Sequence, residues 1–143
     1  MRDILFRAKR RDTGEWVYGD VIQNAHTVKI REHEAEINRI AKSYEIDSDT
    51  LGQYTGLTDK NGKKIFEGDI VSGTAYSNTS IGVIGWIPDI ASFGIEYKSQ
   101  HRAAWENASI LKLLAHRKNS EFVAEVIGNV FDDPELIGGE SDD

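Results

Sequence analysis

The stretch QYTGLTDKNGKKIFEGDIV, residues 53–71, carries the densest pattern of turn and strand signals in the chain. Asn61 and Gly62 form the strongest short-range signal for a β-hairpin, because both residue types tolerate a positive φ. Gly68 permits an unusual backbone conformation where the next apolar run begins, and Asp69 can accept hydrogen bonds from neighbouring backbone N–H groups. These four residues therefore predict a hairpin turn and the entrance to a small β-barrel.

Two ligand-binding interpretations of this stretch fail on spacing. A phosphate-binding P-loop has four residues between its glycines and Ser or Thr after its lysine, whereas five residues separate Gly56 from Gly62 and a second lysine follows Lys63. A calcium-binding EF-hand loop starting at Asp59 would place Lys63 at a ligand position. We therefore expect neither a phosphate site nor a calcium site here.

The N-terminal 50 residues continue the strand pattern. Alternating residues at 3–9, a turn at RDTG and the β-prone run EWVYGDVI predict an antiparallel hairpin over residues 3–22. The alternation places Ile4, Phe6 and Ala8 on one face and Asp3, Arg7 and Lys9 on the other. Val28 and Ile30 extend the strand interpretation.

One segment changes period. Within EHEAEINRIAKSY, Ile37, Ile40, Ala41 and Tyr44 recur at helical spacing and predict a short amphipathic helix. Ser48 and Asp49 are suited to starting a single further helical turn.

Strand and turn signals resume after residue 69. Ile81, Val83 and Ile87 share one face, Phe93, Ile95 and Tyr97 share another, and Pro88 and Asp89 mark the turn between them. Residues 103–115 fit a short helix or a buried strand equally well. EFVAEVIGNVF predicts a last strand, DDPEL a single helical turn capped by its acidic residues, and residues 138–143 a disordered tail.

Composition limits the possible functions. The chain has 143 residues, no cysteine, and a net charge of −7 from 17 Lys and Arg against 24 Asp and Glu. One domain without disulfides or thiolate metal sites is expected, and the negative charge opposes binding to a nucleic-acid backbone. No run approaches the roughly 18 apolar residues of a membrane span or the apolar core of a signal peptide, so we expect a cytoplasmic protein. The basic N-terminus and the acidic C-terminus suggest contact between neighbouring copies or, alternatively, contact between the two ends of one chain.

Catalytic and metal-binding patterns are lacking. His26, His33, His101 and His116 show no zinc-ligand spacing, and there is no G-x-S-x-G motif. Glu67 and Asp69 could share one face of a strand, but a structural or solvated pair is the favoured interpretation. Trp16, Trp86 and Trp105 are more typical of core or interface anchors than of platforms for nucleic-acid bases. We predict no catalytic, cofactor-binding or metal residues.

Several motifs together resemble the YopX family of phage and prophage proteins: ILFRAK, LGQYTGLTDKNGKKIFEGDIV, GVIGW, FGIEY and EVIGNVFDDPEL. The resemblance implies a mainly β chain with an SH3-type antiparallel barrel, a phage or prophage origin and homo-oligomerisation. It implies no activity and no catalytic residues. Residues 33–43 and 98–119 match none of its motifs.

These observations predict one YopX-like domain over residues 1–143, with an N-terminal hairpin and short helix at 1–50, the barrel at 51–137 and the tail at 138–143. The expected function is that of a non-enzymatic, self-associating accessory protein that also binds a host or phage protein. A nucleic-acid-related role, through the barrel or by acidic mimicry of DNA, is the alternative, and a small-molecule enzyme is the third class.

Overall fold

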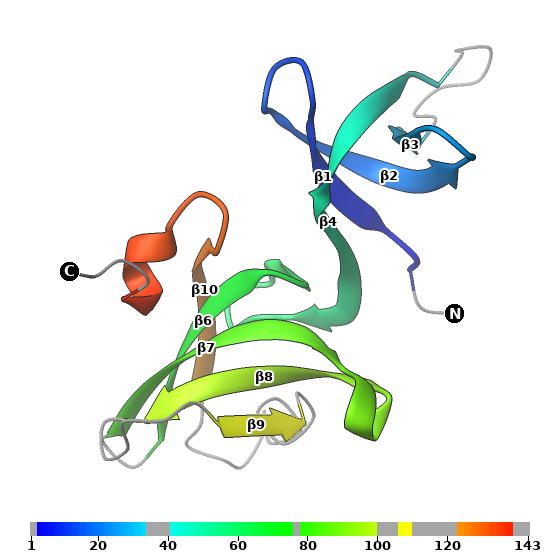
Figure 1. The fold of residues 1–143 in the computed structure, drawn as a ribbon. Coiled ribbons are helices and arrows are strands. Elements are labelled where there is room, and N and C mark those ends of the chain that lie inside the picture. Colours follow the sequence, from blue (N-terminus) through cyan, green and yellow to red (C-terminus); the bar gives the residue numbers. More distant parts are fainter. Residues whose placement is uncertain (1–2, 34–40, 76–77, 100–105, 110–122, 139–143) are drawn as a thin grey trace. The chain divides into compact units, whose positions relative to one another are not determined.

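The structure, a computed structural model, describes residues 3–33, 41–75, 78–99, 106–109 and 123–138 (Figure 1). These residues are mainly in antiparallel β-strands, which confirms the predicted fold class. The chain divides into two compact units, Met1–Gly56 and Leu57–Asp143. The predicted division at residue 50 stays a prediction. The disordered tail also stays a prediction, because residues 139–143 lie outside the described part of the chain.

The first unit is a ring of strand pairings. It contains β1 (Phe6–Arg10), β2 (Trp16–Gln23), β3 (Val28–Arg31) and the first part of β4 (Ser43–Thr58). The predicted hairpin over residues 3–22 is confirmed, with Phe6 opposite Gly19 and Lys9 opposite Trp16. Because β3 pairs with β4 and β4 also pairs with β1, the order β1-β2-β3-β4 closes on itself. Each strand of this ring therefore has a hydrogen-bonded neighbour on both sides.

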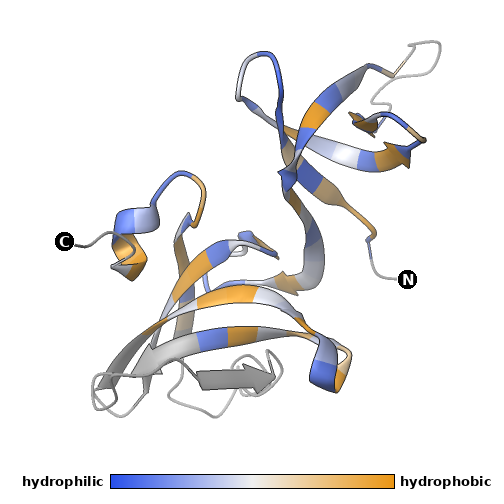
Figure 2. Cartoon of the chain, viewed as in Figure 1, coloured by the Kyte–Doolittle hydropathy of each residue, from blue (hydrophilic) through white to orange (hydrophobic). Residues whose placement is uncertain are grey.

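A small apolar core fills the ring. Ala8, Val17, Ile30 and Ile46 are buried together, and Figure 2 shows hydrophobic colouring on each of these strands. Ile4, by contrast, lies before β1 and is 56% exposed, so the predicted apolar face begins later than expected.

Arg7 departs from the predicted polar face of the first strand. It is only 6% exposed, and its guanidinium carbon lies 4.7 Å from the centroid of the Trp16 ring. Since β1 is paired on both sides and Trp16 covers the guanidinium, the residue is enclosed although it points away from Ala8. Strand alternation alone does not reveal this cover, because the aromatic residue comes from the neighbouring strand.

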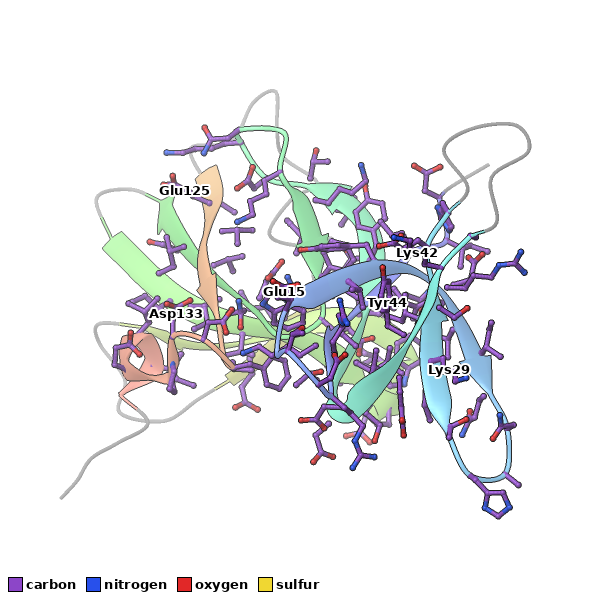
Figure 3. The ribbon with its side chains drawn as sticks, turned by 90° about the horizontal axis from the view of Figure 1, so that it is seen from above. Glu15, Lys29, Lys42, Tyr44, Glu125 and Asp133 are labelled. Carbon is purple, nitrogen blue, oxygen red and sulfur yellow. The ribbon has the colours of Figure 1, made fainter. Side chains whose placement is uncertain are left out.

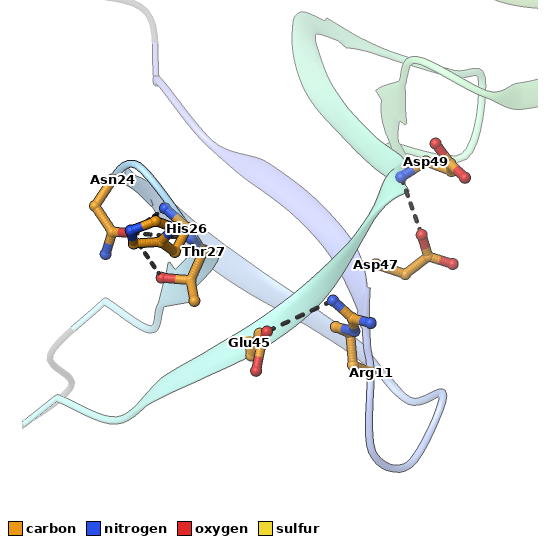
Figure 4. Close-up of polar contacts among 7 residues, drawn as sticks. All are labelled: Arg11, Asn24, His26, Thr27, Glu45, Asp47 and Asp49. Atoms are coloured by element: carbon orange, nitrogen blue, oxygen red, sulfur yellow. Dashed lines mark hydrogen bonds and ion pairs between the residues drawn. The ribbon is translucent and has the colours of Figure 1, made fainter.

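The predicted helical segments near residue 44 are corrected in part. Residues 34–40 lie outside the described part of the chain, but Tyr44 belongs to β4, and so do Ser48 and Asp49. At this point Asp47 Oδ1 accepts a hydrogen bond from the Asp49 N–H at 3.1 Å (Figure 4), and the register between β1 and β4 shifts. The polar residues therefore form a strand irregularity and not a helix start, because pairing with β1 and β3 outweighs their local preference.

The second unit is a five-stranded antiparallel sheet with the order β10-β6-β7-β8-β9. Its strands are β6 (Asp69–Ala75), β7 (Asn78–Ile87), β8 (Ser92–Ser99), β9 (Glu106–Ser109) and β10 (Val123–Asn129). A short β5 (Lys64–Phe66) pairs with the end of β4. The pairings among described residues leave this order open, so the SH3-type barrel over residues 51–137 stays a prediction.

Two short 3₁₀ turns complete this unit. The turn η1 (Pro88–Ile90) joins β7 to β8, as Pro88 and Asp89 predicted, and η2 (Pro134–Ile137) follows β10. The single turn in DDPEL is confirmed, but its predicted acidic cap is wrong: no side chain caps η2, and Asp133 Oδ2 instead accepts from the Asn129 N–H at 3.1 Å. This bond ties the carboxylate of Asp133, which is labelled in Figure 3, to the end of β10.

The core of the second unit comprises Ile65, Val71, Ile84, Ile95 and Val126. β9 confirms the strand alternative at residues 106–109, while the rest of 103–115 lies outside the described part. Ile84, which is buried, lies on the face of β7 opposite Ile81 and Val83. None of the helices formed by the described residues is long and apolar enough to cross a membrane.

Candidate functional site

The fold-determining stretch places Asn61 and Gly62 in the tight turn between β4 and β5. The Asp59 N–H donates to the Lys63 carbonyl at 2.8 Å, and the Gly62 N–H donates to the Asp59 carbonyl at 3.0 Å. Gly62 has φ of 81°, in the left-handed region that favours glycine. The sequence thus supplies the one residue type that adopts this backbone conformation without strain.

Asp59 organises this turn from inside. Its Oδ1 accepts hydrogen bonds from the N–H groups of Asn61 at 2.8 Å and Lys63 at 2.9 Å, and its Oδ2 accepts from the Val126 N–H at 2.9 Å. The residue is 3% exposed. Burial alone would raise the pKa of the Asp59 carboxyl, but the three N–H donors together outweigh it and hold the pKa below the ordinary range.

The same turn covers the outer edge of β10. The Lys60 N–H donates to the Ala124 carbonyl at 3.0 Å, next to the bond from Val126 to Asp59. Two exposed side-chain contacts add to these: Lys60 Nζ lies 3.4 Å from Glu125 Oε2, and Asn61 Nδ2 lies 3.3 Å from Glu125 Oε1 (Glu125 is labelled in Figure 3). An exposed strand edge is a template for unwanted pairing, so the turn satisfies and shields part of that edge.

Gly68 and Asp69 join strands on the other side of β5. Gly68 has φ of 89°; its N–H donates to the Ile84 carbonyl at 2.8 Å and its carbonyl accepts from the Val130 N–H at 2.9 Å. Asp69 is 1% exposed, and its Oδ2 accepts from the Phe66 N–H at 2.8 Å. The four predicted turn residues therefore hold backbone in place and present no reactive group to solvent.

Asp59 is the functional residue of this stretch that sequence reasoning missed. We considered it only as a possible calcium ligand, whereas its role is to bind three backbone donors. A signal was present: an aspartate two residues before Asn-Gly can bond the backbone ahead of it, as in an Asx-turn. The contact with Val126 had no local signal, since it joins residues 67 positions apart.

A groove in the second unit is the candidate interaction site. It has a volume of about 510 Å³, and β7, η1 and β8 form most of its wall, together with Val130, which follows β10, and Ile137, the last residue of η2. Its lining side chains are mostly apolar, namely Val83, Ile84, Trp86, Ile87, Pro88, Val130 and Ile137, joined by the carboxylates Asp89 and Glu96. Among the described residues that line it there is no lysine or arginine.

Trp86 is the most prominent side chain of this groove. It is 51% exposed, and its ring meets Phe93 edge to face with centroids 5.4 Å apart. Ile90, in η1, is also 51% exposed. Among the described residues, no hydrogen bond or ion pair engages the side chain of Asp89 or Glu96. The groove therefore combines an open aromatic surface with two carboxylates that have no partner in the described part of the chain.

The other candidate sites are not assembled by the structure. His33 Nε2 lies 2.9 Å from Asp20 Oδ1 on the surface, and His26 lies in a turn organised by Asn24 (Figure 4). His101, His116 and Trp105 lie outside the described residues. Within the described ranges, His, Asp and Glu form no group of three that could hold a metal ion.

A family model described as YopX protein matches residues 5–138, which includes the turn and the groove. The chain belongs to the YopX family. The resemblance predicted from the motifs is thereby confirmed over most of the length of this YopX-family protein. Among curated proteins, none matches the sequence significantly.

Proposed function

We propose that this YopX-family protein is a non-enzymatic protein-interaction module that self-associates, acts in the cytoplasm of a host cell and serves a phage or prophage. The observation that carries the proposal is the apolar groove with Trp86 half exposed at its wall. Aromatic residues with an exposed apolar surface are enriched at the centres of protein interfaces, where they contribute much of the binding energy. A groove of this character supports binding to protein more than chemistry on a small substrate.

The buried polar groups also support a non-enzymatic role. The two buried carboxylates among the described residues, those of Asp59 and Asp69, accept hydrogen bonds from backbone N–H groups of strands and turns. A carboxylate saturated in this way has a structural task and is poorly suited to take up or release protons during catalysis.

The sequence suggested a charge contact through the basic N-terminal segment, but fewer of its arginines are available for such a contact than expected. Arg10 Nη2 lies 2.7 Å from Asp12 Oδ2, and Arg11 Nη1 lies 3.6 Å from Glu45 Oε1 (Figure 4 shows Arg11 and Glu45). Arg7 is buried. Self-association is therefore better supported by apolar surface than by the basic N-terminal strand, because these cations already have partners within their own unit. A nucleic-acid-related role stays the alternative, and no observation on the described residues favours it.

Light scattering coupled to size-exclusion chromatography over a hundred-fold range of protein concentration tests the proposal. We expect an oligomer in wild-type protein and a shift toward monomer in Trp86→Ala. Ile22→Ala is the matched control, since Ile22 is 40% exposed on β2 and lies outside the groove. A wild-type protein that is monomeric at every concentration would contradict self-association. An oligomer unaffected by Trp86→Ala would show that the groove is not the self-association surface.

A further inference from the structure

We infer that the groove of the second unit binds an extended segment of a partner protein that carries an arginine beside an apolar residue. The inference deepens the proposed function, on which it rests, by naming the chemistry of the partner.

Charge complementarity selects a cationic ligand. Asp89 and Glu96 are the charged residues among the described lining of the groove, and both are exposed. The chain as a whole carries a net charge of −7, so the long-range field also favours cations. An anionic segment would meet two carboxylates with no compensating lysine or arginine among the described lining residues, whereas a cationic segment would give these carboxylates a partner.

Trp86 selects arginine in particular. A guanidinium can stack on an indole face and at the same time donate paired hydrogen bonds to a carboxylate, which the more compact ammonium of lysine does less well. The first unit uses this type of pairing internally: Arg7 lies 4.7 Å from the Trp16 ring centroid, and Arg10 lies 4.3 Å from that of Tyr44 while bonding Asp12. Trp86 and the nearby Asp89 of the same groove offer these partners without an arginine from the described residues, whereas Glu96, paired with Val83, lies on the other sheet face from Trp86.

The apolar wall defines the neighbour of the arginine. Ile87, Pro88, Val130 and Ile137 lie in the same groove, and burying one aliphatic side chain there would remove apolar surface from water on both molecules. The volume of about 510 Å³ falls within the range of about 300–1,000 Å³ that small ligands fill, so a few residues of an extended segment can occupy it. A short linear segment is therefore the fitting occupant.

A second copy of the first unit fits less well. Among its arginines, Arg7 is 6% exposed, while Arg10 and Arg11 are paired with Asp12 and Glu45. Releasing them would break contacts that the free protein already has. A partner whose arginine is unpaired before binding does not have to break such contacts.

Fluorescence anisotropy with labelled peptides tests the inference. The probe is a nine-residue peptide with a central Arg-Leu-Arg in a Gly and Ser background, compared with versions in which both arginines are replaced by citrulline, lysine or glutamate. Citrulline keeps the shape of arginine without its charge. We expect the arginine peptide to bind about ten-fold more tightly than the citrulline peptide and to weaken as NaCl rises from 50 to 500 mM.

Variants of the protein locate the binding. Trp86→Ala, and separately the double variant Asp89→Asn with Glu96→Gln, should each weaken the arginine peptide about ten-fold. The double variant should leave the thermal melt unchanged, whereas Trp86→Ala should lower it slightly because the edge-to-face contact with Phe93 is lost. Asp47→Asn is the matched control, because Asp47 is an exposed carboxylate in the first unit and asparagine keeps the acceptor for Asp49. This control should bind like wild type.

Three results would overturn the inference: equal affinity for arginine and citrulline peptides, affinity unchanged in both groove variants, or a peptide of residues 110–119 of this chain outcompeting the arginine probe. The last would assign the groove to the protein's own sequence. Failure here is separable from failure of the proposed function. An oligomer that binds no peptide keeps self-association and loses the arginine ligand, while a monomer that binds the peptide through Trp86 does the reverse.

Discussion

Removing the Asp59 carboxylate should destabilise the second unit more than any other single polar change in the turn. In Asp59→Ala three N–H donors lose their acceptor. The donor of Val126 belongs to a residue that is 9% exposed, and a buried donor left without an acceptor costs about 1–3 kcal/mol. The donors of Asn61 and Lys63 belong to exposed residues that water can reach, so each costs about 0.5–1 kcal/mol. The expected loss is about 3 kcal/mol in the free energy of unfolding.

Urea unfolding followed by circular dichroism measures this loss. With a slope of about 2 kcal/mol/M, a loss of about 3 kcal/mol lowers the midpoint by about 1.5 M. Lys60→Ala is the matched control: it removes the exposed ion pair with Glu125 but keeps the backbone bond to Ala124, and should cost about 0–1 kcal/mol.

Asp59→Asn separates the two tasks of the carboxylate. Its single carbonyl oxygen can keep the turn donors of Asn61 and Lys63, while its NH₂ group then faces the N–H of Val126. We expect a smaller loss than for alanine, together with faster hydrogen exchange at the Val126 amide. Equal midpoints for Asp59→Ala and Lys60→Ala, or unchanged exchange at Val126 in both Asp59 variants, would refute the role assigned to Asp59.

Two further predictions concern the same turn. Because the folded pKa of Asp59 is lowered, its contribution to the free energy of unfolding is fully present above the ordinary carboxyl pKa of about 3.9 and is lost as pH falls through the folded value. The difference in stability between wild type and Asp59→Asn should therefore narrow below about pH 4. A difference that stays constant from pH 7 to pH 2.5 in urea titrations would contradict this. Gly62→Ala should cost about 1 kcal/mol and Gly85→Ala much less, since an added Cβ meets nothing within 4 Å at either site but only Gly62 has a positive φ; equal melting shifts would remove backbone strain as the cause.

Local signals predicted the elements that local chemistry controls. Asn61 and Gly62 indicated a tight turn, alternation indicated most strands, and DDPEL indicated one helical turn. The errors arose where tertiary contacts decide. Ser48 and Asp49 favour helix starts, yet the pairing of β4 with β1 just before and just after them, at Asp47 and Gly52, keeps them in a strand.

The candidate site was harder to predict than the fold, since its parts are far apart in sequence. Trp86 was expected to be a core or interface residue, but its grouping with Asp89, Glu96 and Ile137 depends on how β7, β8 and η2 pack. Likewise, no residue near Arg7 in the sequence predicts that the Trp16 ring covers its guanidinium. Only the pairing of strands brings these residues together.

The order in which the strands leave the ribosome differs in its consequences for the two units. All four strands of the ring lie within residues 6–58, so the first unit can close early in synthesis. The second unit must wait for β10, whose partner β6 is made about 50 residues earlier. Until β10 arrives, β6 has an open edge and the Asp59 carboxylate has no Val126 to bind, which is the state most exposed to aggregation. Nascent chains stalled just before residue 123 should therefore be the ones that chaperones hold longest.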